Sequence, residues 1–147
     1  MSRDAIAELV HRYSDAVVYR DVDLWASTWA EDAVWKLGPG REVTGRKAIV
    51  ELWLSAIGRF DAVVQNTVNG TVSLDGATGT GTGRWYIVEH FRRASGEAGI
   101  LLAHYDDTYV CVDGTWLFAS RELHQQYQGP PDLSAPFLNS AGIAPAT

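Results

Sequence analysis

The chain has 147 residues, of which 46% are hydrophobic and 20% charged, and a formal net charge of -6 at pH 7. This composition indicates a folded globular domain, and the acidic balance argues against a nucleic-acid partner. No apolar run is long enough to span a bilayer, so no membrane partner is expected. The one cysteine, Cys111, excludes an intrachain disulfide and a cysteine-based zinc site. Since the first residues carry no signal-peptide pattern, the expected location is cytoplasmic.

The first helix is predicted over residues 2–19, with Ser2 as its N-cap. Its apolar residues recur at i, i+3, i+4 and i+7, which is the spacing of one buried helix face. This face is formed by Ile6, Leu9, Val10, Tyr13, Ala16 and Val17.

Three shorter elements are predicted next. Asp21 or Asp23 can cap a short helix over residues 24–32, and a short strand is expected over 33–37. A third helix is expected to begin at Thr44 as N-cap and to end near Gly58. All three predicted helices therefore lie in the first half of the chain.

The second half predicts four long strands, over residues 61–76, 78–93, 98–114 and 115–127. Helices followed by antiparallel strands favour an α+β fold, in which a strongly curved, mostly antiparallel sheet wraps around the N-terminal helices. Such a sheet forms a cone whose open mouth can hold a ligand. Residues 1–127 are thus expected to form a single domain, and 128–147 a Pro/Ala-rich tail that folds back over apolar surface.

Three segments carry a family resemblance: "RYSDAVVYRDVDLWASTWAEDAVW", "TGRKAIVELW" and "YDDTYVCVDGTWLFASRELH". In this order they resemble the NTF2-like superfamily, which has a cystatin-like fold, and within it the SnoaL-like group of polyketide cyclases, dehydratases and dehydrochlorinases. The resemblance covers Ala5 to Tyr127. It implies the cone-shaped fold, a small apolar or polycyclic ligand, no cofactor, and a homodimer or homotrimer.

The dehydratases and dehydrochlorinases of this group use an Asp–His pair. Asp21 matches the aspartate of that pair, while Gln65 stands at the usual histidine position and cannot take a proton at neutral pH. Some dehydratases carry a second pocket histidine, and the resemblance implies that His90 fills this role. His90 is therefore expected to be the general acid or base, with Asp21 orienting it. The plainer alternatives are that Asp21 only caps a helix and that His90 is solvent-exposed.

Alternation along the strand "RWYIVEHF" puts Arg84, Tyr86, Val88 and His90 on one face, which is expected to line the cavity. An ion pair of Arg84 with Asp106 or Asp107 is favoured over a ligand contact. His104 and Asp106 are assigned to the outer face, and no metal is expected because the histidines lack i, i+4 helical spacing. The predicted substrate-binding residues are Tyr13, Trp35, Gln65, Tyr86, Val88 and Tyr105.

The predicted function is that of a lyase or isomerase, meaning a dehydratase, isomerase or cyclase, that works by His/Asp acid–base chemistry. Tyr13 matches the oxyanion-hole tyrosine of the steroid-isomerase branch, but Leu37 stands where that branch has its catalytic base. The alternative hypothesis is a non-catalytic binder of a hydrophobic ligand, or an assembly subunit. The substitution at Gln65 favours this alternative.

Overall fold

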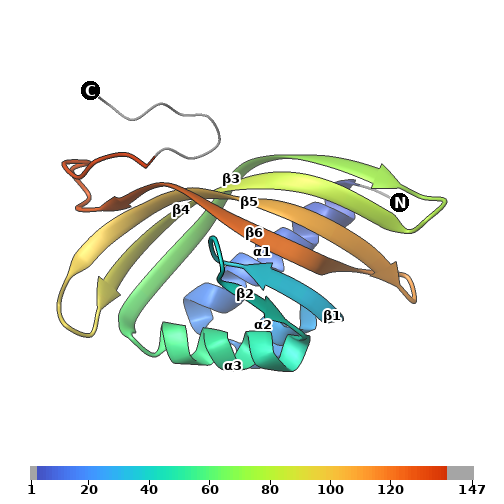
Figure 1. Ribbon diagram of the computed structural model, residues 1–147, viewed down its shortest axis with the longest axis horizontal. Helices are drawn as coiled ribbons and strands as arrows, with labels where there is room; N and C mark the ends of the chain where they lie inside the picture. Colours follow the sequence, from blue (N-terminus) through green and yellow to red (C-terminus); the bar gives the residue numbers. More distant parts are fainter. Residues whose placement is uncertain (1–2, 139–147) are drawn as a thin grey trace.

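The computed structural model describes residues 3–138, in which three helices lie under one face of a six-stranded sheet (Figure 1). The helices are α1 (Arg3–Tyr19), α2 (Val22–Ser27) and α3 (Arg46–Ile57). The strands are β1 (Trp29–Lys36), β2 (Glu42–Thr44), β3 (Phe60–Asp75), β4 (Thr80–Arg93), β5 (Ala98–Val112) and β6 (Thr115–Gly129).

The strands follow the order β2-β1-β6-β5-β4-β3, and only the β1–β6 pair is parallel. The four long strands bend together, so that the sheet arches over the helices (Figure 1). The predicted α+β fold, with a curved and mostly antiparallel sheet around N-terminal helices, is confirmed.

Helix α1 buries the apolar face that its sequence predicts. Ile6, Leu9, Val10 and Ala16 are fully buried, and Tyr13 is 1% exposed. This face packs against the inner side of the sheet, where the long strand β3 contacts the helix. The amphipathic pattern therefore fixes how α1 lies under the sheet.

Tryptophan rings join the short elements below the sheet. Trp25 of α2 stacks on Trp53 of α3 with ring centroids 4.4 Å apart and an interplanar angle of 10°. Trp25 also contacts Trp35 of β1, with centroids 5.5 Å apart. Because large aromatic side chains bury much apolar surface, this cluster holds α2, α3 and β1 together.

Two element boundaries differ from the sequence expectation. Helix α2 ends at Ser27 and β1 already begins at Trp29, because Trp29 pairs with Phe118 of β6 and joins the sheet. Thr44 lies in the short strand β2, which the pattern did not predict, and the N-cap of α3 is Gly45 with φ of 95°. Thr44 as helix cap was therefore wrong.

The described part of the tail folds back onto the end of the sheet, as expected. The Phe137 ring contacts Tyr127 with centroids 4.9 Å apart, and the Ala135 backbone N–H donates to the Tyr127 hydroxyl at 3.2 Å. The rest of the predicted tail, including Ile143, lies outside the described residues. Among residues 3–138, no helix combines the length and the apolar character that crossing a bilayer requires.

Candidate functional site

A cavity of about 370 Å³ lies between the inner face of the sheet, α1, α3 and β1. Its wall is mostly apolar, and Trp35, Trp53, Phe60, Val63, Phe91 and Leu101 contribute to it. Polar side chains also line it: Tyr13, Gln65, Glu89, Tyr105 and Gln125, together with the exposed residues Arg41, Ser55, Arg59 and Gln128. An apolar pocket with few convergent polar groups is the usual form of a small-molecule site.

Glu89 is the one acidic side chain among the described residues that line the cavity. It lies on the inner face of β4, between the buried side chains of Ile87 and Phe91. Burial raises the pKa of Glu89 above its ordinary value, while the hydrogen bond from Gln65 acts in the opposite direction. A carboxyl group whose pKa is raised by an apolar surrounding is a typical general acid or base.

A chain of hydrogen bonds from α1 to β4 holds this carboxyl group. Ser14 donates to Gln65 Oε1 at 2.9 Å, and Gln65 Nε2 donates to Glu89 Oε1 at 3.1 Å. The Ser14 hydroxyl also lies 2.8 Å from Thr67 Oγ1. Since Ser14 uses its hydrogen on Gln65, Thr67 is the donor to Ser14, and all four groups are oriented.

Tyr13 and Tyr105 bring two hydroxyl groups to the cavity, and their rings meet edge to face with centroids 6.0 Å apart. Burial raises the pKa of both tyrosines above the ordinary value, and the Arg121 charge opposes this change. Both hydroxyl groups therefore stay protonated at neutral pH. Because they also hydrogen-bond each other, one of the two hydrogens is left to donate to a ligand oxygen.

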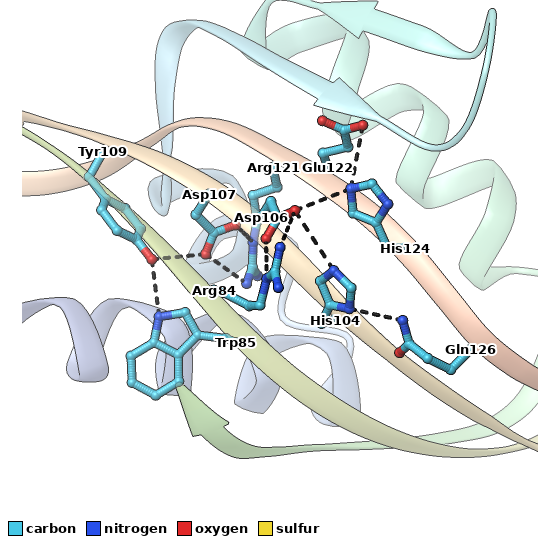
Figure 2. Close-up of polar contacts among 10 residues, drawn as sticks. All are labelled: Arg84, Trp85, His104, Asp106, Asp107, Tyr109, Arg121, Glu122, His124 and Gln126. Atoms are coloured by element: carbon cyan, nitrogen blue, oxygen red, sulfur yellow. Dashed lines mark hydrogen bonds and ion pairs between the residues drawn. The ribbon is translucent and has the colours of Figure 1, made fainter. Parts of the chain in front are cut away.

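Arg121 lies behind this tyrosine pair, with its guanidinium carbon 3.8 Å from the ring centroid of Tyr105 and 4.4 Å from that of Tyr13. Its Nε and Nη2 donate to the two carboxylate oxygens of Asp107 at 2.7 and 3.2 Å. Asp107 also accepts from Tyr109, and Tyr109 from Trp85, each at 3.0 Å (Figure 2). This buried network fixes the guanidinium against the tyrosine rings.

The cavity brings together four of the residues predicted to bind substrate. Tyr13, Trp35, Gln65 and Tyr105 all line it, and all are buried. They come from α1, β1, β3 and β5, so the site draws on both halves of the chain. Their roles toward a ligand stay predictions.

The predicted cavity face of β4 was wrong. His90 is exposed and lies opposite Val64, which is itself 44% exposed on the outer face of the sheet. Tyr86 and Val88 share this outer face, and neither lines the cavity. The reason is that burial of large apolar side chains stabilises the core. Strand β4 therefore buries Trp85, Ile87 and Phe91, and its alternate, more polar side chains face solvent.

Asp21 is the N-cap of α2, where its side chain accepts from the Leu24 backbone N–H at 3.1 Å. It is exposed and does not line the cavity. The predicted pair of His90 and Asp21 is therefore not assembled, and the plainer alternative holds for both residues. The favoured ion pair of Arg84 is with Asp106, at 2.6 Å.

The sequence did not predict Glu89, which lines the cavity, or Arg121, which lies behind its tyrosine pair. The sequence did contain a signal for Glu89. A single carboxylate on a strand face of Trp, Ile and Phe side chains is rarely buried unless it has a partner or a function. Arg121 had no such signal. The register between β5 and β6 shifts between Phe118 and Ser120, so that Phe118 and Arg121 are both buried although they are three residues apart.

Comparisons with known proteins agree with this architecture. The profile of the SnoaL-like domain matches residues 1–122. Among solved structures, a protein assigned as a scytalone dehydratase from Novosphingobium aromaticivorans is 27% identical, with a TM-score of 0.82, over 96% of this chain and 93% of that one. A search of curated proteins found no match.

Two dehydrochlorinase structures are also similar. A type 2 hexachlorocyclohexane dehydrochlorinase (LinA) is 20% identical, with a TM-score of 0.81, over 96% of this chain and 95% of that one. The LinA-type3 enzyme from Novosphingobium barchaimii LL02 is 21% identical, with a TM-score of 0.79, over 87% of this chain and 88% of that one. At this identity the likeness concerns the fold alone. With the profile match over residues 1–122, it follows that the chain belongs to the SnoaL-like domain family of the NTF2-like superfamily.

Proposed function

We propose that this chain is a lyase or isomerase that binds a small, largely apolar or polycyclic molecule and moves a proton with Glu89. The observation that carries this proposal is the raised pKa of a carboxyl group that lines the apolar cavity beside two buried tyrosines. In this proposal Glu89 has the role of general acid or base that the sequence analysis assigned to His90, with Asp21 as its orienting partner. No cofactor is required for this reaction.

Glu89 acts as the base toward a carbon next to a carbonyl group. The C–H bond breaks, its proton goes to the Glu89 carboxylate, and the electron pair becomes an enolate. Return of the proton to another carbon completes an isomerisation. Transfer of the proton to a departing hydroxyl group, which leaves as water, completes a dehydration. In both cases Glu89 ends as it began.

Tyr13 and Tyr105 hold the oxygen on which the negative charge develops. One hydroxyl group donates to this oxygen and the other donates to its partner tyrosine, in a site with an apolar wall where such bonds are stronger than in water. Arg121, 3.8 Å from the Tyr105 ring centroid, adds a fixed positive charge behind them. The 27% identical structure assigned as a scytalone dehydratase supports the choice of the lyase class.

The test uses 1-tetralone, a bicyclic ketone, and follows exchange of its α-hydrogens in deuterated water by proton NMR. The unmodified protein is expected to accelerate this exchange. Glu89→Gln is expected to lower the catalysed rate about 10²- to 10⁴-fold, which is the usual contribution of a general base. Glu51→Gln, which changes an exposed glutamate of α3 in the same way, is the matched control.

An exchange rate that Glu89→Gln leaves unchanged would contradict the role of Glu89. Saturable quenching of tryptophan fluorescence by 1-tetralone, without any exchange, would instead support the second hypothesis, a non-catalytic binder of hydrophobic ligands. That hypothesis is favoured by Gln65, which stands where the family uses a histidine. The proposed homodimer or homotrimer is a separate matter, and light scattering on the intact chain decides it.

A further inference from the structure

The outer face of the sheet carries a cluster that the cavity does not use. His104 of β5 lies directly opposite His124 of β6, and their rings stack with centroids 4.9 Å apart at 17°. Asp106 lies two residues further along β5 and therefore on the same face. Glu122 of β6 lies directly opposite Asp106. Two cross-strand pairs thus place two imidazoles beside two carboxylates.

The donor atoms of this cluster converge. Asp106 Oδ2 lies 3.3 Å from His124 Nε2 and 3.7 Å from His104 Nε2 (Figure 2). The three ligand atoms all lie within 4.8 Å of one another. Glu122 Oε1 lies 3.4 Å from His124 Nε2. His104, Asp106 and His124 are therefore close enough to one another to hold one small ion, and Glu122 borders this group at His124.

His104 Nε2 is a second, independent observation. The His104 side chain is 1% exposed, because the rings of Tyr86 and His124 cover it from the two neighbouring strands. Its Nε2 atom is buried without a hydrogen-bond partner. A buried polar atom without a partner costs free energy. This atom is directed toward the carboxylate and lacks the partner that a bound ion would supply.

We propose that His104, His124 and Asp106 bind a divalent transition-metal ion such as Zn²⁺, with Glu122 or a water molecule as the fourth ligand. In tetrahedral zinc sites the bonds to nitrogen and oxygen are about 2.0–2.2 Å long, which puts ligand atoms about 3.3–3.5 Å apart. The distances from Asp106 to the two histidines come close to this spacing. Imidazole and carboxylate groups also form the donor set that Zn²⁺ accepts in proteins.

The surrounding side chains suit this role. The amide nitrogen of Gln126 lies 2.9 Å from His104 Nδ1. Rotation of this amide by 180° would bring its oxygen to the same place, where it would accept the Nδ1 proton and leave the Nε2 lone pair for the metal. Arg84 donates to Asp106 Oδ1 at 2.6 Å and to Oδ2 at 3.2 Å. Lys36 of β1 lies opposite Glu122 and lines the same groove, so Arg84 and Lys36 balance the charges of Asp106 and Glu122. The attraction for a dication therefore comes from the converging donor atoms and not from a net negative charge.

An ion can reach the cluster from solvent. Asp106 and Glu122 line an open groove of about 580 Å³ on this face, together with Arg84, Thr108 and Ser120. Their side chains are 37% and 45% exposed. The site lies on the opposite side of the sheet from Glu89, so it does not depend on the proposed function of the cavity.

The experiment titrates the full chain, without an affinity tag and after dialysis against EDTA, with Co²⁺ and then Zn²⁺. We expect one equivalent of Co²⁺ to bind with a visible absorption band, and Zn²⁺ to displace it. His124→Gln and Asp106→Asn are each expected to weaken binding at least about tenfold. His90→Gln, an exposed histidine on the same sheet face, is the matched control and is expected to bind normally.

Circular dichroism of each variant checks that it is folded. His124 is substituted in preference to His104 because it is less buried, so its replacement disturbs the packing less. Two results would overturn the proposal. One is the absence of saturable one-to-one binding of either ion in equilibrium dialysis. The other is an affinity that both His124→Gln and Asp106→Asn leave unchanged.

Discussion

Gln65 and Glu89 lie directly opposite each other on β3 and β4, and the amide of Gln65 donates to the carboxyl group of Glu89 at 3.1 Å. In the described part of the chain this is the one hydrogen bond that the Glu89 side chain makes. Its other oxygen is free to meet a ligand in the cavity. The pKa of Glu89 is therefore set by two opposing effects, burial and one amide donor.

Glu89→Gln is expected to stabilise the fold at neutral pH. Burial raises the pKa of Glu89 above 4.5 in the folded protein, so the folded state binds this proton more tightly than the unfolded state. The free energy of unfolding then falls as pH rises from the ordinary pKa through the raised one, and this loss is complete above the raised pKa. Urea unfolding across this pH window measures it. Equal pH dependence in the variant and the unmodified protein would contradict the expected shift.

Gln65→Leu is expected to raise the pKa of Glu89 further, because it removes the donor that stabilises the charged carboxylate. The acid limb of the pH–rate profile for 1-tetralone exchange should move to higher pH. Gln125→Leu is the matched control, since Gln125 also lines the cavity and makes no described hydrogen bond to Glu89. A profile that moves equally in both variants would assign the effect to cavity polarity in general.

The fold could be predicted from the sequence because its helices and strands have hydrophobic patterns that are periodic over long segments. The apolar face of α1 recurs over about three turns, from Ile6 to Val17, and the four long strands are separated by turn residues such as Asp113-Gly114. The same periodicity predicted that Tyr13 and Tyr105 are buried at the site. The prediction for the face of β4 was wrong because Tyr86 and His90 were assigned to the cavity, whereas polar side chains on one face of a half-buried strand usually face solvent.

Register shifts contribute to the two site residues that were missed, Glu89 and Arg121. At the tip of the β3–β4 hairpin Asp75 pairs with Thr80, and an unbroken register would bring Gln65 opposite His90. The shift between Thr67 and Gly70 inserts one residue, so Gln65 meets Glu89 instead. One-residue bulges leave little trace in a hydrophobic pattern. His104 and His124 are brought together by the pairing of β5 with β6. The i, i+4 spacing that indicates a metal site on a helix does not detect such a pair.

Two arginine–aspartate pairs of nearly equal geometry are expected to differ widely in energy. Arg84 meets Asp106 at 2.6 and 3.2 Å, and Arg121 meets Asp107 at 2.7 and 3.2 Å. The first pair is 44% and 37% exposed, the second 1% and 0%. Arg121→Gln should therefore cost about 3–5 kcal/mol, because it leaves a buried carboxylate unpaired. Arg84→Gln should cost about 0–1 kcal/mol.

Urea unfolding of the two variants at neutral pH measures this difference. A third variant that combines Arg121→Gln with Asp107→Asn tests the reason for it, because it removes the unpaired charge along with its partner. It is expected to be more stable than Arg121→Gln alone. Equal costs for Arg84→Gln and Arg121→Gln would show that burial does not control the strength of these pairs.

Gly70→Ala is expected to destabilise the fold by about 1–3 kcal/mol, since overfilling a packed site forces side chains and backbone to move. A Cβ atom at Gly70 would overlap the ring of Trp85 and lie 2.7 Å from the Arg84 carbonyl oxygen. The residue therefore has to be glycine where β3 bulges past β4. Gly58→Ala is the control, because Gly58 has φ of -64°, which alanine adopts without strain. Thermal and urea unfolding measure both variants, and equal stability of the two would mean that the bulge accommodates a side chain by shifting Trp85.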